Sequence, residues 1–216
     1  MEFKYLAYCF ADAVLIATSL IYGIKFLKKR NIMLGGELLV VTFSATNLLI
    51  NALTEIPMYL NVSLFCDAFS RCFGIPVIAI VGLMAASHRF KPSAFVDVVL
   101  FTLGLVVTVI FWTADFLKEP KPYFYLVLWS IFSLYLAYFA VKLLRAGEKL
   151  QALSILLAMT FAQTIASIYD FYHIPGDDDH VIFYIFALLA WSLLGVAMYH
   201  AYCALERLQS KPQTFS

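Results

Sequence analysis

Apolar stretches long enough to cross a membrane recur along almost the whole chain, and this feature limits the fold more than any other. An α-helix needs about 20 mostly apolar residues to cross a hydrocarbon core of roughly 30 Å. Of the 216 residues, 63% are hydrophobic and 13% are charged, and the mean hydropathy is +0.86. A soluble domain is about 45–50% apolar and about 25% charged. We therefore expect a multi-pass integral membrane protein.

Seven spans are expected, each joined to the next by a short polar connector. Transmembrane strands would need about ten alternating residues closed into a barrel, whereas these apolar runs are continuous and about twice as long. The predicted fold is all-α, a seven-transmembrane-helix bundle over residues 1–208 followed by a short polar tail at 209–216. The approximate bounds of the spans are 4–26, 37–60, 63–87, 94–116, 122–144, 149–172 and 181–205.

Lys and Arg residues collect on one side of the predicted bundle. Eleven of the 15 lie in the first, third and fifth connectors or in the tail, three lie on the other side, and Arg71 lies within a span. Cytoplasmic loops carry the excess of basic residues. We therefore expect the N-terminus outside and the C-terminus in the cytoplasm, in a bacterial inner membrane or its equivalent.

Two parts of the chain resemble each other at an offset of about 117 residues. "LIYGIKFLKK" before "VTFSAT" matches "LAYFAVKLLRA" before "MTFAQT", and "GLMAASH" at Gly82–His88 faces "GVAMYH" at Gly195–His200. Parallel three-helix repeats occur in transporters, although two apolar helices can also match by chance. The layout is similar to the three-plus-one-plus-three plan of SWEETs, KDEL receptors and opsins. The resemblance is limited to architecture, because spans one and five lack a Pro-Gln pair and span seven lacks a Lys to hold retinal.

Polar groups recur at helical spacing inside several spans. In "NLLINALTE", Asn47, Asn51 and Glu55 are four residues apart, which places them on one helix face at steps of about 6 Å. A charged group facing lipid at mid-membrane costs at least about 2.5–3.5 kcal/mol, so such groups are expected to face the bundle interior. We predict that they line a hydrated cavity that opens outward. The candidate binding residues are Asp12, Asn47, Asn51, Glu55, Asp67, Arg71, Gln163, Ser167 and Asp170.

A purely structural role is the alternative for many of these groups. Asp67 and Arg71 are an i, i+4 acid–base pair and can neutralise each other. Amides and hydroxyls between membrane helices often serve only as hydrogen-bonded contacts worth about 0.6–2 kcal/mol each. One Arg cannot compensate all the acids at this depth, so those left without a partner must hold a proton or bind a cation. Pro76 predicts a kink in the third span.

Several kinds of catalytic centre are excluded by spacing. The chain has no G-x-S-x-G, no H-E-x-x-H and no phosphate-binding Gly-rich loop. His88 and His200 are expected on the inner side and His173 and His180 on the outer side, which excludes a three-histidine zinc site and disfavours haem. "HIPGDDDH" offers imidazole and carboxylate ligands for a divalent metal, but a solvated acidic turn explains it more simply. No cofactor and no metal site are predicted.

Three functions remain open. The favoured hypothesis is a transporter or receptor whose cavity binds a cationic or zwitterionic small molecule, with proton coupling through Glu55 or Asp170. The first alternative is an intramembrane enzyme that acts on lipid with Glu55 and Asp170 as acid and base. The second is a sensor or accessory subunit that needs a partner protein. Membrane lipids and a small-molecule ligand are the expected partners, and no nucleic acid is expected.

Overall fold

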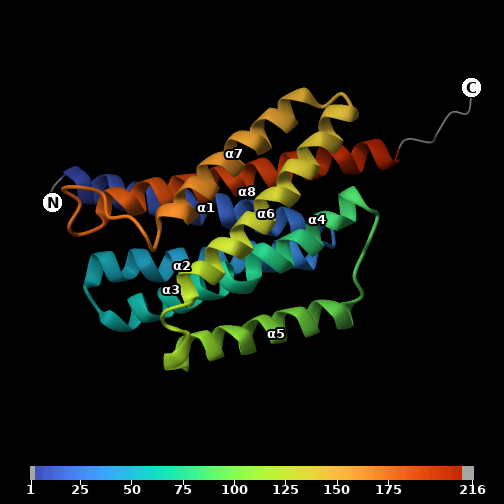
Figure 1. The fold of residues 1–216 in the computed structure, drawn as a ribbon. Helices are drawn as coiled ribbons and strands as arrows, with labels where there is room; N and C mark the ends of the chain where they lie inside the picture. The colour runs from blue at the N-terminus through green and yellow to red at the C-terminus, as the bar shows by residue number, and fades with distance from the viewer. Residues whose placement is uncertain (1–2, 211–216) are drawn as a thin grey trace, which may run out of the picture.

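The computed structural model describes residues 3–210, which form a bundle of long helices without any strand in that range (Figure 1). Seven helices in this part of the chain are long and apolar enough to cross a membrane. This confirms the predicted all-α membrane bundle. The spans are α1 (Phe3–Lys28), α2 (Ile32–Thr54), the continuous series α3 (Pro57–Phe69), η1 (Ser70–Ala79) and α4 (Ile80–Ser87), then α5 (Ala94–Thr113), α6 (Lys121–Arg145), α7 (Lys149–Ile168) and α8 (Val181–Ser210).

Several ends of the predicted spans need correction, among them that of the sixth, which was predicted at residue 172 and lies at Ile168. A short 3₁₀ turn, η2 (Asp115–Leu117), follows α5 inside the fourth predicted span. Helix α8 continues to Ser210, two residues past the predicted end of the bundle domain. The rest of the predicted tail, residues 211–216, lies outside the described part of the chain.

The turn between the second and third spans lies earlier than the sequence predicted. Glu55 caps α2 in a left-handed conformation (φ 57°, ψ 24°), and its N–H donates to the Asn51 carbonyl. Ile56 is extended, which the following proline favours, and Pro57 occupies the first turn of α3, where its missing N–H is not needed. At the other end, α2 begins at Ile32 because the Asn31 side chain caps it. The second span is therefore shifted toward the N-terminus, whereas the third begins earlier than predicted, at Pro57, and ends at Ser87 as predicted.

The third span contains a π-helical segment where a kink was predicted. Proline lacks an N–H and its ring clashes with the carbonyl four residues earlier, so Pro76 cannot continue a regular α-helix. The wider i→i+5 turns of η1 accommodate Pro76 over ten residues, Ser70–Ala79. Nine of these ten residues are buried. The span thus stays continuous, but its middle section has a different number of residues per turn from its two ends.

The helices pack mainly against their neighbours in the chain, and α1 also packs along α8 (Figure 1). Helix α5 lies at the edge of the bundle and contacts chiefly η1 and α3. Its contact face carries Gly104, where an added Cβ would lie 2.8 Å from the rings of Phe69 and Phe73. The first three and the last three spans form two consecutive groups, with α5 between them in the chain. Whether the groups are true repeats stays a prediction, as does the orientation in the membrane.

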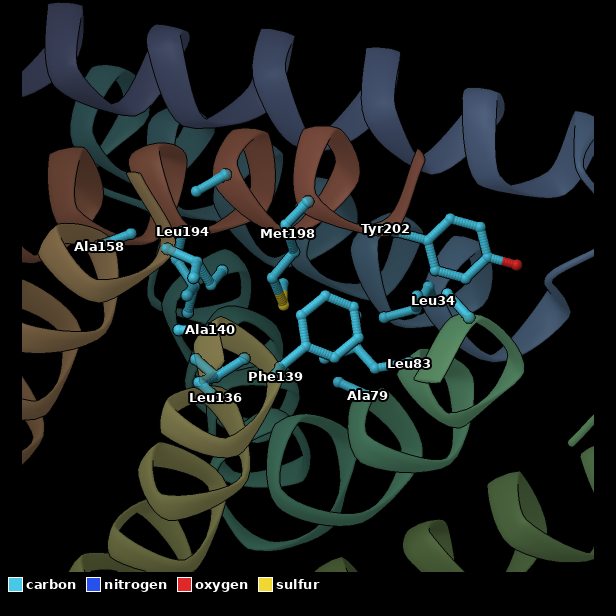
Figure 2. Packing of buried hydrophobic residues seen from close by; sticks show 14 of the residues in the cluster. Leu34, Ala79, Leu83, Leu136, Phe139, Ala140, Ala158, Leu194, Met198 and Tyr202 are labelled. Atoms are coloured by element: carbon cyan, nitrogen blue, oxygen red, sulfur yellow. The ribbon is translucent and has the colours of Figure 1, made fainter. Parts of the chain in front are cut away.

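An apolar core fills one half of the bundle. Phe139 of α6 lies among Leu83 and Ala79 of the third span and Met198 of α8, as Figure 2 shows. Lipid tails are as apolar as these side chains, so close packing and dispersion hold the helices together here. Leu194 and Met198 belong to this core and also face an internal cavity. The core therefore closes that cavity at one end.

Candidate functional site

An internal cavity lies between α1, α2, the third span and α8. Its cavity volume is about 80 Å³, and the empty space between its lining side chains is about 920 Å³ when open solvent is counted. Trp129 of α6 and Tyr169 at the end of α7 complete its wall, together with Tyr184 and Trp191 of α8. The polar side chains that line it are Thr18, Ser19, Ser44, Ser63, Asp67, Ser70 and Arg71.

The two ends of the cavity differ in chemistry. Asp67 and Arg71 line it near the end of the bundle where α8 begins, beside Tyr169 and Tyr184. The apolar side chains Leu38, Ile75, Leu194 and Met198 line it farther along their helices, toward the buried core. The cavity is thus charged at one end and apolar at the other.

Arg71 holds two acids at the charged end. Its guanidinium forms an ion pair with Asp170, which follows α7, and its Nη1 lies 3.8 Å from Asp67 Oδ2. The Tyr169 hydroxyl donates a hydrogen bond to Asp67 Oδ2 over 3.2 Å. The i, i+4 pair of Asp67 and Arg71 is therefore present, but Arg71 is shared with Asp170.

The Arg71 guanidinium lies over two tyrosine rings. The guanidinium carbon lies 4.3 Å from the centre of the Tyr125 ring and 3.9 Å from that of Tyr169. Cations over aromatic faces are attracted by the ring quadrupole, and the attraction strengthens when water is excluded. The Arg71 side chain is only 9% exposed. The guanidinium is therefore held in place, with its edge left for hydrogen bonding.

The charges in this cluster do not cancel. Asp67, Asp170 and Arg71 carry two formal negative charges and one positive charge. The Asp67 and Asp170 side chains keep 20% and 24% of their exposure, whereas the Arg71 side chain keeps 9%. Asp67 lines the cavity and Asp170 does not, so the excess negative charge of the cluster faces the cavity at Asp67.

Asp12 is sealed within the bundle and has no visible hydrogen-bond partner. It is 0% exposed, and neither carboxylate oxygen is hydrogen-bonded. Leu15 and Ser19, three and seven residues later on the same helix, both line the cavity, but Asp12 does not. The prediction that Asp12 faces the interior is confirmed, although it lies beside the cavity.

The predicted polar stripe of α2 does not face the cavity as a unit. Glu55 is exposed in the turn after α2, so its predicted place in the bundle interior is wrong. Asn47 is buried but donates to the Phe43 carbonyl of its own helix, and Asn51 is half-buried. Ser44 is the member of this face that lines the cavity, where its hydroxyl donates to the Ser63 carbonyl over 3.0 Å. The misplaced turn explains the error for Glu55.

Gln163 joins α7 to α6, Ser167 bonds to Gln163 within α7, and neither residue lines the cavity. The Gln163 carbonyl accepts from the Ser133 hydroxyl at 2.7 Å, and its amide donates to Ser167 at 3.2 Å. Ser167 also donates to the Gln163 backbone carbonyl. These two residues therefore make the structural contacts that the sequence allowed as the alternative.

No known protein family, curated protein or solved structure matches this chain. The function is therefore inferred from the chemistry of the cavity.

Two acidic residues in the loop before α8, Asp177 and Asp179, have structural roles. Asp177 accepts from the backbone N–H groups of Ile182 and Phe183 and so caps α8. Asp179 pairs with Lys4 at 2.6 Å, and the hydrogen bond from Lys4 holds the pKa of the Asp179 carboxyl below its ordinary value. Within residues 3–210, no group of three or more His, Cys, Asp or Glu side chains could hold a metal ion.

Sequence reasoning missed Glu37, a second sealed acid. Glu37 is 1% exposed, and neither oxygen has a hydrogen-bond partner. The predicted second span, 37–60, begins at Glu37 and so places it at the end of a helix. In the structure it lies in the sixth position of α2 and contacts η1. In the sequence, a capping residue at Asn31 followed by an apolar run that continues past Glu37 indicates a helix that begins before Glu37 and contains it.

Proposed function

We propose that the protein is a membrane receptor or carrier for an amphiphilic small molecule with a cationic or zwitterionic headgroup. The observation that supports it is a cavity lined at one end by Asp67 and Arg71, with Asp170 paired to Arg71 beside it, and by apolar side chains at the other end. A headgroup would lie at the charged end, and an apolar tail would extend toward the core.

The carboxylates favour a positive group in the ligand. An amine or quaternary ammonium beside Asp67 and Asp170 would balance the excess negative charge. The aromatic walls at Tyr169 and Trp191 add a preference for a cation over a ring face. An acidic group of a zwitterion would compete with Asp67 and Asp170 for the Arg71 guanidinium, which already contacts both acids.

The proposed orientation determines which side of the membrane the charged end of the cavity faces. If the basic connectors lie in the cytoplasm, the charged end faces outward and the apolar end lies toward the inner half of the bundle. The three-plus-one-plus-three repeat and the location in a bacterial inner membrane belong to the same proposal. A cysteine-accessibility experiment in intact cells, with single cysteines at exposed Glu119 and Arg145, would test the orientation.

Binding of a lipid of known charge tests the function. Purified protein in detergent would be mixed with lysophosphatidylcholine, which is zwitterionic, or with lysophosphatidic acid of the same chain length, which is anionic. Native mass spectrometry should detect preferential retention of the zwitterion. The Asp67→Asn, Asp170→Asn double variant should lose that preference, while Ser167→Ala should keep it. Equal retention of both lipids by wild type would contradict the proposal.

An intramembrane enzyme that acts on lipid is the second candidate. Two carboxylates on one guanidinium, beside a tyrosine hydroxyl, could act as general base and general acid toward a bound headgroup. Asp67 and Asp170 replace the earlier pair in this hypothesis, because Glu55 is exposed in a turn. Incubation with the same zwitterionic lipid separates the candidates. An enzyme releases product in a time-dependent reaction, whereas a receptor leaves the lipid intact.

A sensor or accessory subunit remains the third proposal. It predicts a stable partner protein that co-purifies from the native membrane in mild detergent. Lipid binding without any partner would favour the receptor or carrier.

A further inference from the structure

Glu37 of α2 is packed directly against the backbone of the third span. An added Cβ on Gly74 would overlap the Glu37 carboxylate, so only glycine allows this approach. Ser70, one turn earlier in η1, is close to Glu37 and also lines the cavity. The carboxyl group therefore lies behind the cavity wall and is separated from it by η1.

The side chains around this carboxyl do not form a metal site. Both oxygens of Glu37 have almost no accessible surface and no hydrogen-bond partner. A Ca²⁺ ion would need about six to eight oxygen ligands at roughly 2.3–2.6 Å, and within residues 3–210 no three His, Cys, Asp or Glu side chains gather to supply them. A proton, which needs no such shell, neutralises Glu37 while η1 keeps this position.

The neighbouring groups do not compensate a charge on Glu37. The titratable side chains that interact with it are the thiols of Cys66 in α3 and Cys72 in η1. None of the ion pairs within residues 3–210 includes Glu37. An isolated carboxylate in a low-dielectric interior is so unfavourable that the group neutralises instead.

We propose that Glu37 is a proton-binding site inside the membrane: the carboxyl is neutral while η1 packs against it and becomes charged only when η1 moves away. Loss of the proton breaks the carboxyl O–H bond and transfers the proton to water that enters from the cavity past Ser70. The charged form then needs that water, so it stabilises a conformation in which Gly74 no longer contacts Glu37. This inference does not depend on the identity of the cavity ligand.

Infrared spectroscopy of the purified protein tests the protonation state directly. At neutral pH, the wild type should show the C=O stretch of a protonated carboxylic acid. Labelling with ¹³C-glutamate should shift a band that belongs to Glu37 and leave one from Asp12, the other sealed acid, unchanged. The glutamate-sensitive band should be absent from Glu37→Gln and retained in Glu55→Gln, which changes an exposed acid.

Hydrogen exchange tests the link between this proton and η1. Raising the pH of wild-type protein into the alkaline range should increase the exchange of η1 amides beyond the intrinsic acceleration measured in α6. In Glu37→Gln, which is neutral at every pH, that excess should disappear. If exchange of η1 follows α6 at all pH values in the wild type, the proposed movement of η1 is wrong.

Two results would overturn the proton site itself. One is the absence of a glutamate-sensitive carboxylic acid band in wild type at neutral pH. The other is persistence of that band in Glu37→Gln. If Glu37→Gln does not fold, Gly74→Ala provides the second assignment, because the new Cβ must displace the carboxyl and change its band frequency. An unchanged band in Gly74→Ala would then count against Glu37.

Discussion

Asp67 and Glu37 are acids on either side of the same helical wall, yet their surroundings are opposite. Asp67 shares Arg71 with Asp170, accepts a hydrogen bond from Tyr169, and keeps 20% of its side-chain exposure. Glu37 is 1% exposed, and its carboxylate oxygens have neither a hydrogen-bond partner nor a counter-charge. The difference suggests that negative charge is retained only where a cation and water are both within reach.

The largest effect on stability is expected when the cation of the charged cluster, Arg71, is removed. Arg71→Met should leave Asp67 and Asp170 uncompensated and lower the free energy of unfolding by about 3–5 kcal/mol. Adding Asp67→Asn and Asp170→Asn should recover most of the loss. Denaturation in mixed detergent micelles would measure it. Lys118→Met is the control, because its pair with Asp115 is exposed and should change stability by less than about 1 kcal/mol. Equal stability of Arg71→Met and wild type would refute the compensated cluster.

The next largest effect is expected where Gly74 packs against the buried carboxyl of Glu37. Gly74→Ala forces its new Cβ into the Glu37 carboxyl and should destabilise the fold by about 1–3 kcal/mol. Gly195→Ala is the matched control, because its Cβ would meet Leu38 at an ordinary 3.5 Å. That variant should be neutral or up to about 1 kcal/mol more stable, since alanine favours helix. A Glu37→Ala, Gly74→Ala double variant should lose less than the sum of the two single losses.

The hydrogen bonds of Gln163 show how much an uncharged polar contact contributes to stability, against which the effects at the acids can be compared. Gln163→Leu removes the hydrogen bonds with Ser133 and Ser130 that join α6 to α7 and should cost about 0.6–2 kcal/mol of unfolding free energy. Lipid retention should not change, because Gln163 does not line the cavity. Thr164→Val, which changes an exposed side chain on the same helix, is the control for both measurements. Loss of lipid retention in Gln163→Leu alone would extend the site to the α6–α7 contact.

The smallest effect is expected at the exposed pair of Lys4 and Asp179. The pKa of Asp179 is lowered in the folded protein, so its stabilisation is present above the ordinary pKa and is lost as pH falls through the lowered one. The thermal midpoint of wild type should therefore fall slightly more in acid than that of Asp179→Asn. Salt should weaken the difference, because exposed charges are screened. Identical acid profiles at low salt would show that this pair contributes nothing.

The sequence predicted the spans better than their ends. Averaging hydropathy over about 20 residues detects a long apolar run but smooths over a two-residue turn. Pro57 carried the missing information, because proline is favoured in the first turn of a helix and restricts the residue before it. Reading Pro57 as a helix start would have moved Glu55 out of the bundle.

The site was predictable only where the contact is local. Asp67 and Arg71 are one helical turn apart, so their pairing follows from sequence spacing. Asp170 reaches Arg71 from a distant part of the chain, and the burial of Glu37 depends on how η1 packs across α2. Both depend on tertiary packing, which hydrophobic periodicity does not encode.

The π-helical segment has a mechanical consequence for the third span. Tightening η1 to an α-helix would change the rotation accumulated over its ten residues, so α3 and α4 would turn relative to each other. Asp67 and Arg71 lie toward one end, while Gly82 accepts a hydrogen bond from the Asn31 side chain toward the other. Both sets of contacts could not survive such a rotation. A change of helix type in η1 would therefore rotate the end of the span that carries Asp67 and Arg71 relative to the end that is fixed at Gly82.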